Sequence, residues 1–555
     1  MTHFLKFLKK IPLLDWLSLG VLALAGYVLC RHLSQISDLE LGDEAYYGYI
    51  ANHFFPERPI RGDWGPLYSL WYLFLRIFET DSVRLYFLNM VVLSTLAPLA
   101  LYVGLRSAGQ SWWFALYFSL VFAFSPLNVP IGVKISVLIF ILSMLMLFIA
   151  RFKNLLAADS LALLTVFATL FAYMRPENIL VAGAAVVMGV GLRLYQKQTL
   201  SPIFFSLVPL LVLVVCIGLP VSDKATLTFQ QDFSANYAIM YPEKVKNLNG
   251  WIDYDKIVQI AFGQKVVSVP QALQINPMLY FEAHILANHR GIVDNIKTIF
   301  LDLFSPFAWI AAKVPHKSKI SLLLVLLFLA SIDPRKIRVS LAEVWQQTGR
   351  ALLFLVAILA GVAFASYYSS GYKIRYWVLC YAILPILIGA IWQFWVLSSR
   401  SIAVNDYFKK VLQTGAGALF FGLVFLFLKQ QNDRLAAINR PQTSVARVRY
   451  YQKLASSLSH NREIVAFDPP DQLGTHVNWK CITWSDYKRD NTFPRFVADK
   501  KITFLYFHKF ARDYYNTDSS FRAFIQKPPA NFTKIYNAPN DEYIFVEKKH
   551  LAAVK

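Results

Sequence analysis

WVLCYAILPILIGAIWQFWVL, the stretch from Trp377 to Leu397, contains no Asp, Glu, Lys or Arg. Val83–Leu105 is similar and carries only Arg84. Each stretch approaches the roughly 20 apolar residues that a helix needs to cross the hydrocarbon of a bilayer. Every backbone amide in lipid needs a partner within the chain, so these stretches are expected to be helices. The whole chain is 56% hydrophobic and 16% charged, whereas a soluble domain is about a quarter charged.

Apolar blocks recur along the 555 residues, and we expect a polytopic α-helical membrane protein with about eleven spans. The first block follows Lys6, Lys9 and Lys10. Its length and the lack of a small-residue cleavage pattern favour a retained anchor over a signal peptide. The expected spans lie near residues 13–32, 82–105, 111–127, 130–150, 158–174, 178–194, 201–220, 318–332, 348–366, 374–397 and 407–428.

Much of the net charge of +21 lies in short loops, and positive charge marks every second connection between the apolar blocks. Cytoplasmic loops are enriched in Lys and Arg, so the N-terminus is expected inside and residues 33–81, 221–317 and 429–555 outside. Charge in these loops orients the chain against anionic membrane lipids and does not indicate nucleic acid binding. The basic residues in the connections that we expect to be cytoplasmic are Lys6/Lys9/Lys10, Arg106, Arg151/Lys153, Arg193/Lys197, Arg335/Lys336/Arg338 and Arg400/Lys409/Lys410.

Ile296–Ala312 is apolar but contains Lys297, Asp302 and Pro306. We expect it to be an interfacial or re-entrant helix on the outer face, because counting it as a span would place Arg335–Arg338 outside. Cys30, Cys216 and Cys380 lie in apolar blocks and only Cys481 in a polar region. This set predicts neither a disulfide framework nor a metal cluster.

The tail beyond residue 428 differs in composition from the apolar region 1–428. Ser444–Leu458 has helical spacing, while Ile464–Phe467, Ile502–Phe507 and Tyr543–Val546 are short runs of β-forming residues. Residues 429–555 are therefore expected to fold as a small outward-facing α/β domain, separate from a membrane domain at 1–428.

The first outward loop contains two adjacent carboxylates, Asp43 and Glu44, followed by Tyr46. Asp43 is a good N-cap for a helix that starts at Glu44, and nearby tyrosines suit a membrane interface. For such a pair taken alone, we favour this interpretation over a catalytic one by about two to one, because N-caps are far commoner than catalytic carboxylates. Further along the loop the chain reads Pro56-Glu57-Arg58-Pro59-Ile60-Arg61 and then Gly65-Pro66-Leu67-Tyr68.

Two further motifs carry charge at the outer ends of expected spans. Arg175-Pro176-Glu177 allows a local ion pair at a helix break, but ionisable residues near membrane depth usually have a function. Lys373 and Arg375 precede the span that starts near residue 374. Their positions fit snorkelling side chains, and guanidinium groups also match phosphate oxygens bidentately.

In their order, these motifs resemble the GT-C glycosyltransferases, and specifically the branch with protein O-mannosyltransferases and lipid A aminoarabinose transferases. The resemblance covers residues 13–428 and rests on the acidic pair, Gly65-Pro66-Leu67-Tyr68, Arg175-Pro176-Glu177 and Arg375-Tyr376. It implies a GT-C-like fold and a polyprenyl-phosphate sugar donor. The acceptor would be a hydroxyl of a lipid, glycan or protein on the outer face, and transfer would invert the anomeric carbon.

The resemblance also implies residue roles. Asp43 is expected to be the catalytic base and Glu44 its helper, since the attacking hydroxyl has to lose a proton. Glu177, Tyr46 and Lys373 are expected to contact substrate. No cofactor is expected to be required, although an Asp-Glu pair can bind a divalent metal weakly. The arginines expected to bind the donor phosphate are Arg58, Arg61, Arg175 and Arg375.

Two other functions remain open. A transporter or flippase of lipid-linked saccharides would use the same outward groups, but such proteins usually show paired repeats and broken helices, which the sequence lacks. A non-catalytic scaffold would tolerate Asp43→Asn. Because the chain ends without a retention signal, we expect the bacterial plasma membrane and not the endoplasmic reticulum.

Overall fold

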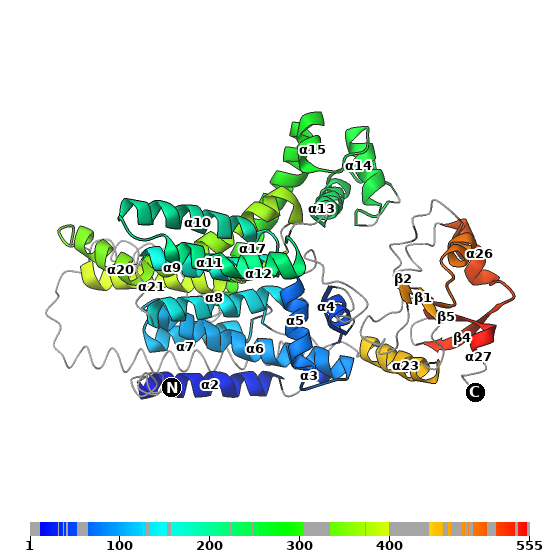
Figure 1. Ribbon diagram of the computed structural model, residues 1–555, viewed down its shortest axis with the longest axis horizontal. Helices are drawn as coiled ribbons and strands as arrows, with labels where there is room; N and C mark the ends of the chain where they lie inside the picture. Colours follow the sequence, from blue (N-terminus) through cyan, green and yellow to red (C-terminus); the bar gives the residue numbers. More distant parts are fainter. Residues whose placement is uncertain are drawn as a thin grey trace, which may run out of the picture. The chain divides into compact units, whose positions relative to one another are not determined.

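The computed structural model is mostly helical and ends in a small β-sheet (Figure 1). It divides into two compact units. Unit 1 comprises residues 1–32, 60–67 and 91–437, and unit 2 comprises residues 33–59, 68–90 and 438–555. The structure describes residues 12–30, 33–36, 38–39, 43–52, 65–125, 127–128, 133–152, 157–220, 224–246, 248–251, 253–304, 333–371, 373–398, 443–458, 464–467, 480–482, 487, 492–507, 518–538 and 542–551.

Helices of unit 1 account for most of the described chain. They are α2 Leu13–Cys30, α7 Trp112–Ala123, α8 Ile135–Phe152, α9 Ala157–Ala172, α10 Asn178–Tyr195, α11 Ser201–Ser206, α12 Val208–Ile217, α13 Lys224–Met240, α14 Tyr254–Phe262, α15 Val269–Ile275, α16 Pro277–Tyr280, the π-helix η2 Phe281–Leu286, α17 Ala287–Leu303, α20 Ile337–Ala365, the π-helix η3 Ser366–Ser370, the 3-10 helix η4 Ile374–Trp377 and α21 Cys380–Ser398. Helices α5 Pro66–Leu75 and α6 Ser82–Ser107 contribute to both units.

Six helices in the described residues are long and apolar enough to cross a membrane, whereas nine of the expected spans fall in this part of the chain, so the prediction of about eleven spans is wrong. The six are Leu13–Cys30, Ser82–Ser107, Ile135–Phe152, Asn178–Tyr195, Ile337–Tyr368 and Ile374–Trp395. Three expected spans are shorter helices, namely Trp112–Ala123, Ala158–Ala172 and Ser201–Ile217. The last of these is split at Leu207, ahead of Pro209. The expected spans at 318–332 and 407–428 lie outside the described residues.

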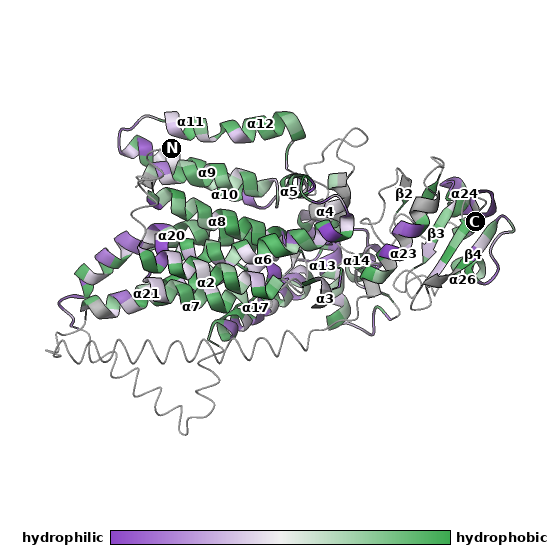
Figure 2. Ribbon diagram, turned by 90° about the horizontal axis from the view of Figure 1, so that it is seen from below, coloured by the Kyte–Doolittle hydropathy of each residue, from purple (hydrophilic) through white to green (hydrophobic). Residues whose placement is uncertain are grey.

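Large apolar side chains cover the outside of these helices. Val187 is 72% exposed and Val215 is 77% exposed, and helix α12 buries none of its residues. The hydropathy colouring shows α8, α9, α11 and α12 as mainly hydrophobic (Figure 2). Soluble proteins do not present apolar surface of this extent to water, so the helices are embedded in lipid.

Within unit 1 the apolar helices lie alongside one another, with α9 packed against α8, α10 and α11, and α20 against α10 and α21 (Figure 1). Helices α13, α14 and α15 lie beyond one end of this bundle, and the first residue of α2 lies toward the other end (Figure 1). Phe229, Phe233, Ile257 and Phe262 belong to a separate hydrophobic cluster that joins α13 to α14. Helices α13, α14 and α15 therefore form a folded layer at that end.

The interfacial helix expected at Ile296–Ala312 is only partly described. Ile296–Leu303 forms the end of α17, which ends before Pro306, and the rest of the block lies outside the described residues. Helix α17 does not meet the length and hydropathy of a spanning helix.

Unit 2 contains a five-stranded mixed sheet with the order β2-β1-β3-β5-β4. Strand β1 pairs in parallel with β2 and β3, while β5 pairs antiparallel with β3 and β4. The predicted helix and three predicted strands are confirmed, while β2 and β4 were missed. The elements are α3 Leu33–Ile36, α4 Asp43–Asn52, α23 Thr443–Leu458, β1 Val465–Phe467, β2 Lys480–Ile482, α24 Phe493–Asp499, β3 Phe504–Phe507, α26 Ser519–Gln526, β4 Phe532–Ala538, β5 Glu542–Glu547 and α27 Lys548–Leu551.

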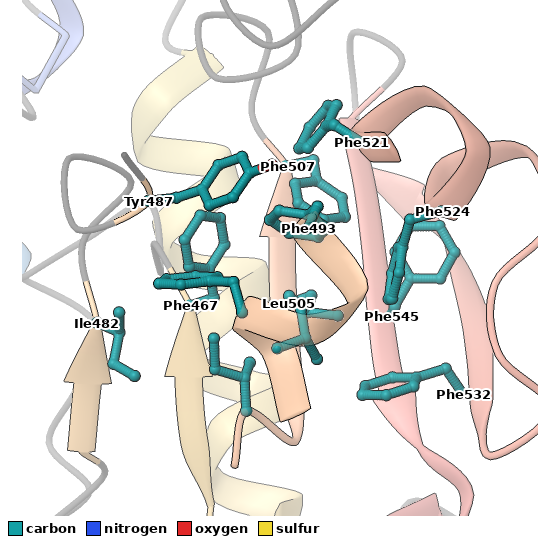
Figure 3. Packing of buried hydrophobic residues seen from close by; sticks show 13 residues of the cluster. Phe467, Ile482, Tyr487, Phe493, Leu505, Phe507, Phe521, Phe524, Phe532 and Phe545 are labelled. Carbon is teal, nitrogen blue, oxygen red and sulfur yellow. The ribbon is translucent and has the colours of Figure 1, made fainter. Parts of the chain in front are cut away.

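Aromatic residues fill the core on one face of this sheet (Figure 3). Phe493 of α24 packs edge-on against Phe521 and Phe524 of α26, at ring-centroid distances of 5.0 and 5.2 Å. Phe507 of β3 and Phe545 of β5 continue the cluster across the sheet. Burial of several aromatic side chains, each covering roughly 150–250 Å², gives the tail a core of its own.

The N-terminal turn of α23 is held by the loop after the first span. The carboxylate of Asp38 accepts the backbone N–H of Val445 at 3.0 Å. One turn further along α23, Arg449 forms an ion pair of 2.6 Å with Asp81. Helix α23 of the tail therefore contacts both ends of the 33–81 segment.

Candidate functional site

Glu44 is fully buried and accepts three hydrogen bonds through one carboxylate oxygen, Oε1. Tyr68 and Tyr72 of α5 donate at 2.6 and 2.5 Å, and Asn89 of α6 donates through Nδ2 at 2.8 Å. Burial, and then the charge of Glu44, raise the pKa of both phenols well above its usual value, so both stay protonated donors. Three donors hold this carboxylate in one position.

Asp43 is the first residue of α4, one position earlier than the expected helix start, and it is half-buried. A carboxylate in the first turn of a helix is stabilised by the positive end of the helix dipole. The two adjacent acids thus differ, because Glu44 is enclosed by donors and Asp43 is not fully enclosed. Tyr46 lies on the same helix.

Arg175 joins two motifs that are about 200 residues apart in the sequence. Its guanidinium carbon lies 3.8 Å from the centre of the Tyr376 ring. It also forms the local ion pair with Glu177 at 3.2 Å, with both side chains about 15% exposed. The local ion pair predicted for Arg175-Pro176-Glu177 is therefore confirmed. The arginine also packs on the Arg375-Tyr376 motif.

Two more cations, Lys373 and Arg375, act electrostatically on the same Tyr376 side chain as Arg175. The guanidinium of Arg375 lies 5.6 Å from the Tyr376 ring, and the ammonium of Lys373 lies 5.0 Å from the ring of Trp251. Attraction between each cation and an aromatic face offsets part of the repulsion between these like charges. We refer to Arg175, Lys373 and Arg375 as the cation cluster.

The Gly65-Pro66-Leu67 motif lies beside this cluster. Gly65 has a φ of +59°, which favours glycine, and Pro66 begins α5, where its missing N–H costs nothing. The next N–H, that of Leu67, donates to the carbonyl of Tyr173 at 3.3 Å. Tyr173 in turn donates its hydroxyl to Gly218 at 2.7 Å. The start of α5 is thereby fixed to the turn that carries Arg175.

Arg58 and Arg61, predicted to bind phosphate, lie outside the described residues. Among the described residues, no group of three or more His, Cys, Asp or Glu side chains is arranged to hold a metal ion.

A comparison with protein-family models finds no match, and a comparison with curated proteins finds none either. The resemblance to GT-C glycosyltransferases rests on the motifs alone, and the function has to be argued from the site.

Several residues of the site were not predicted from sequence. Tyr68 and Tyr72 are one helical turn apart on an apolar helix, and this spacing is the only signal that they act together. Asn89 was read as part of a span. The sequence indicates Tyr376 only as a neighbour of Arg375, and it gives no signal for Asp232 of α13. Their partners come from distant segments, so local patterns do not identify them.

His284 is a buried histidine whose surroundings give it a structural explanation. It stacks on Tyr280 at a centroid distance of 5.3 Å, and the Asn288 side chain next to it donates to the Ser366 carbonyl at 2.9 Å. Burial lowers the pKa of His284 to about 4, so it is neutral at physiological pH. It serves to join η2, α17 and η3.

Proposed function

We propose that the protein is a membrane glycosyltransferase that moves a sugar from a polyprenyl phosphate to an acceptor hydroxyl on the outer face. The observation that carries the proposal is the packing of Arg175 on Tyr376, which brings the Arg175 and Arg375 motifs together. A scaffold has no need to collect cations from two distant turns. A leaving phosphate does need fixed positive charge in a partly dry site.

The cation cluster suits a phosphate monoester. A planar guanidinium donates two parallel hydrogen bonds to phosphate oxygens, and stacking on Tyr376 fixes the plane of Arg175 before substrate arrives. Glu177 holds Arg175 from another side. A preorganised donor contributes more to catalysis than a mobile one, because it does not have to be ordered in the transition state.

In the proposed reaction the acceptor oxygen attacks the anomeric carbon as the bond from that carbon to the phosphate oxygen breaks. The phosphate leaves with the bonding electrons, the acceptor proton passes to Asp43, and the anomeric configuration inverts. Developing positive charge on the sugar is stabilised by a nearby carboxylate. Glu44, held by three donors, is assigned to positioning the first turn of α4.

The proposal includes the sidedness of the chain, with the N-terminus in the cytoplasm and the tail outside. Support comes from the alternation of basic loops and from the position of α13–α15 beyond one end of the bundle, away from the start of α2. A bacterial plasma membrane is the proposed location, since a polyprenyl-phosphate donor is presented there on the outer leaflet.

The test is turnover of radiolabelled polyprenyl-phosphate hexoses and pentoses by the purified protein in lipid nanodiscs, with EDTA present. Release of polyprenyl phosphate with transfer of the label to acceptor or water is expected for at least one donor. No turnover with any donor, together with exchange of the intact donor between leaflets of a liposome, would instead support a flippase.

A further inference from the structure

Asp232 lies on α13 and is 6% exposed, yet its Oδ2 atom has no hydrogen-bond partner among the described residues. Burial of a carboxylate oxygen without a partner is costly, and native structures seldom retain it without a reason. A Cβ placed on Gly371 would lie 1.9 Å from this oxygen. The carboxylate therefore points at the backbone of Gly371, two residues before Lys373.

Two independent features of position 371 require a glycine. Its φ of +71° lies in the region that favours glycine, and its missing side chain leaves the space that Asp232 occupies. The chain thus brings a carboxylate directly against the turn that carries the cation cluster. Lys373 is close enough to act on Asp232 electrostatically, which opposes the effect of burial.

Trp251 lies in a turn that is held against α13, the helix that carries Asp232. Gln231, the neighbour of Asp232, donates to the Trp251 carbonyl at 3.3 Å, and a Cβ on Gly250 would lie 2.6 Å from Ala235 Cα. The indole is 43% exposed, and the Lys373 ammonium lies 5.0 Å from its ring. Lys373 therefore lies near the indole face of Trp251 and is also close enough to the Asp232 carboxylate to act on it electrostatically.

We infer that Asp232, Trp251 and Lys373 form a subsite for a hydroxylated sugar ring, so that the acceptor of the proposed transferase is a carbohydrate. Carboxylate and ammonium groups pair with neighbouring sugar hydroxyls, and the C–H face of a sugar ring packs on an indole. That the sugar is the acceptor rests on the proposed function. The subsite itself is testable without a donor.

The probes are methyl α-D-mannoside, methyl β-D-glucoside and methyl β-D-galactoside, measured by saturation-transfer NMR on the full chain in nanodiscs. Ring-proton saturation and a titratable affinity are expected for at least one probe. The per-O-methylated form of that probe, which has no hydroxyl hydrogens, is expected to show none. At pH 8, above the pKa of about 7 of the buried Asp232 carboxyl, Asp232→Asn is expected to weaken binding by about tenfold, the size expected when a hydrogen bond to a charged group is lost.

Trp251→Leu is a second variant, and because the side chain is partly exposed the fold should tolerate it. A loss of at least several-fold is expected for it also. Asp294→Asn is the matched control, because Asp294 is an exposed carboxylate on α17. Unchanged affinity in both variants, or no saturation of any probe in the wild type, would overturn the inference.

Failure of the subsite and failure of the proposed function are distinguishable. Sugar binding that depends on Asp232, combined with no turnover of any donor, would retain the subsite and reject the transferase. Turnover without sugar binding would do the reverse.

Discussion

Adjacent residues in this protein take different roles because their surroundings differ. Glu44 is enclosed by Tyr68, Tyr72 and Asn89, whereas its neighbour Asp43 is half-buried at the start of a helix. Loss of one donor to a buried carboxylate costs about 1–3 kcal/mol of folding stability. Replacing Tyr68, Tyr72 or Asn89 is therefore expected to destabilise the protein by about this amount. The sequence separates the two acids by their positions at a helix start, but it does not predict the three donors around Glu44.

At Arg175 the charge and the planar shape of the guanidinium have separate effects. Arg175→Lys keeps the charge but loses the stacking on Tyr376 and the bidentate geometry. We expect the KM for a polyprenyl-phosphate donor to rise by about tenfold, corresponding to roughly 1.4 kcal/mol, with thermal stability close to wild type. Steady-state kinetics measures the KM, and thermal unfolding measures the stability. Arg290→Gln is the control, because Arg290 is an exposed arginine on α17. An unchanged KM would remove Arg175 from phosphate binding.

Asp232 predicts a pH dependence of stability. Burial raises the pKa of this carboxyl to about 7, with Lys373 opposing the rise. Between the ordinary pKa of an aspartic acid and about pH 7, the folded protein therefore holds a proton that the unfolded chain has released. By linkage, its contribution to stability is present at low pH and is lost as the pH rises through about 7, by at most about 1.4 kcal/mol per pH unit.

Asp232→Asn lacks this titration. Between pH 5 and 7 the unfolding temperature of the wild type should fall relative to that of the variant, and the two curves should run parallel above pH 8. Scanning fluorimetry in detergent measures both. Parallel curves over the whole range would mean that Asp232 is not held protonated by burial.

Among the elements, the long apolar helices were predictable and the short ones were not. Hydropathy located the six long helices, because about 20 apolar residues leave no alternative in lipid. It could not separate a full span from Trp112–Ala123, since Phe124 and Leu127 just beyond the helix are also apolar. Strands β2 and β4 were missed because they are the edges of the sheet, where a single neighbour supplies the pairing and the sequence pattern is weak.

The contact between α23 and the first outward loop gives a prediction for this element. Asp38 caps α23 through Val445, so Asp38→Ala should remove about 1 kcal/mol of local stability. Backbone amides of residues 443–458 should then exchange about five times faster in hydrogen–deuterium exchange. Asp499→Ala, at an exposed carboxylate on α24, is the control. Equal exchange in Asp38→Ala and wild type would show that the tail helix does not depend on this cap.

For the molecule as a whole, sidedness is the property on which the function depends. In a background where Cys30, Cys216, Cys380 and Cys481 are replaced, Lys265→Cys on the α14 side should react with a membrane-impermeant maleimide in intact cells. Lys197→Cys, also at an exposed lysine, should react only after the membrane is opened. Labelling of Lys197→Cys in intact cells would reverse the orientation.

Charge patterning and hydropathy thus predicted that the protein is a helical membrane protein with an α/β tail, and they identified the motifs of the candidate site. They did not predict Asp232, Tyr376 or the donors around Glu44. These residues acquire their surroundings from segments tens to hundreds of positions away, and no local period encodes such pairings.

The central claim is that Asp43 removes a proton from the acceptor as the sugar leaves its lipid phosphate. Its most direct test compares wild type with Asp43→Asn for transfer from the radiolabelled polyprenyl-phosphate sugar that the wild type uses. A positioned base contributes about 10²–10⁴-fold to a rate, so we predict a loss of turnover on that scale with donor binding retained. Full turnover by Asp43→Asn would contradict the account.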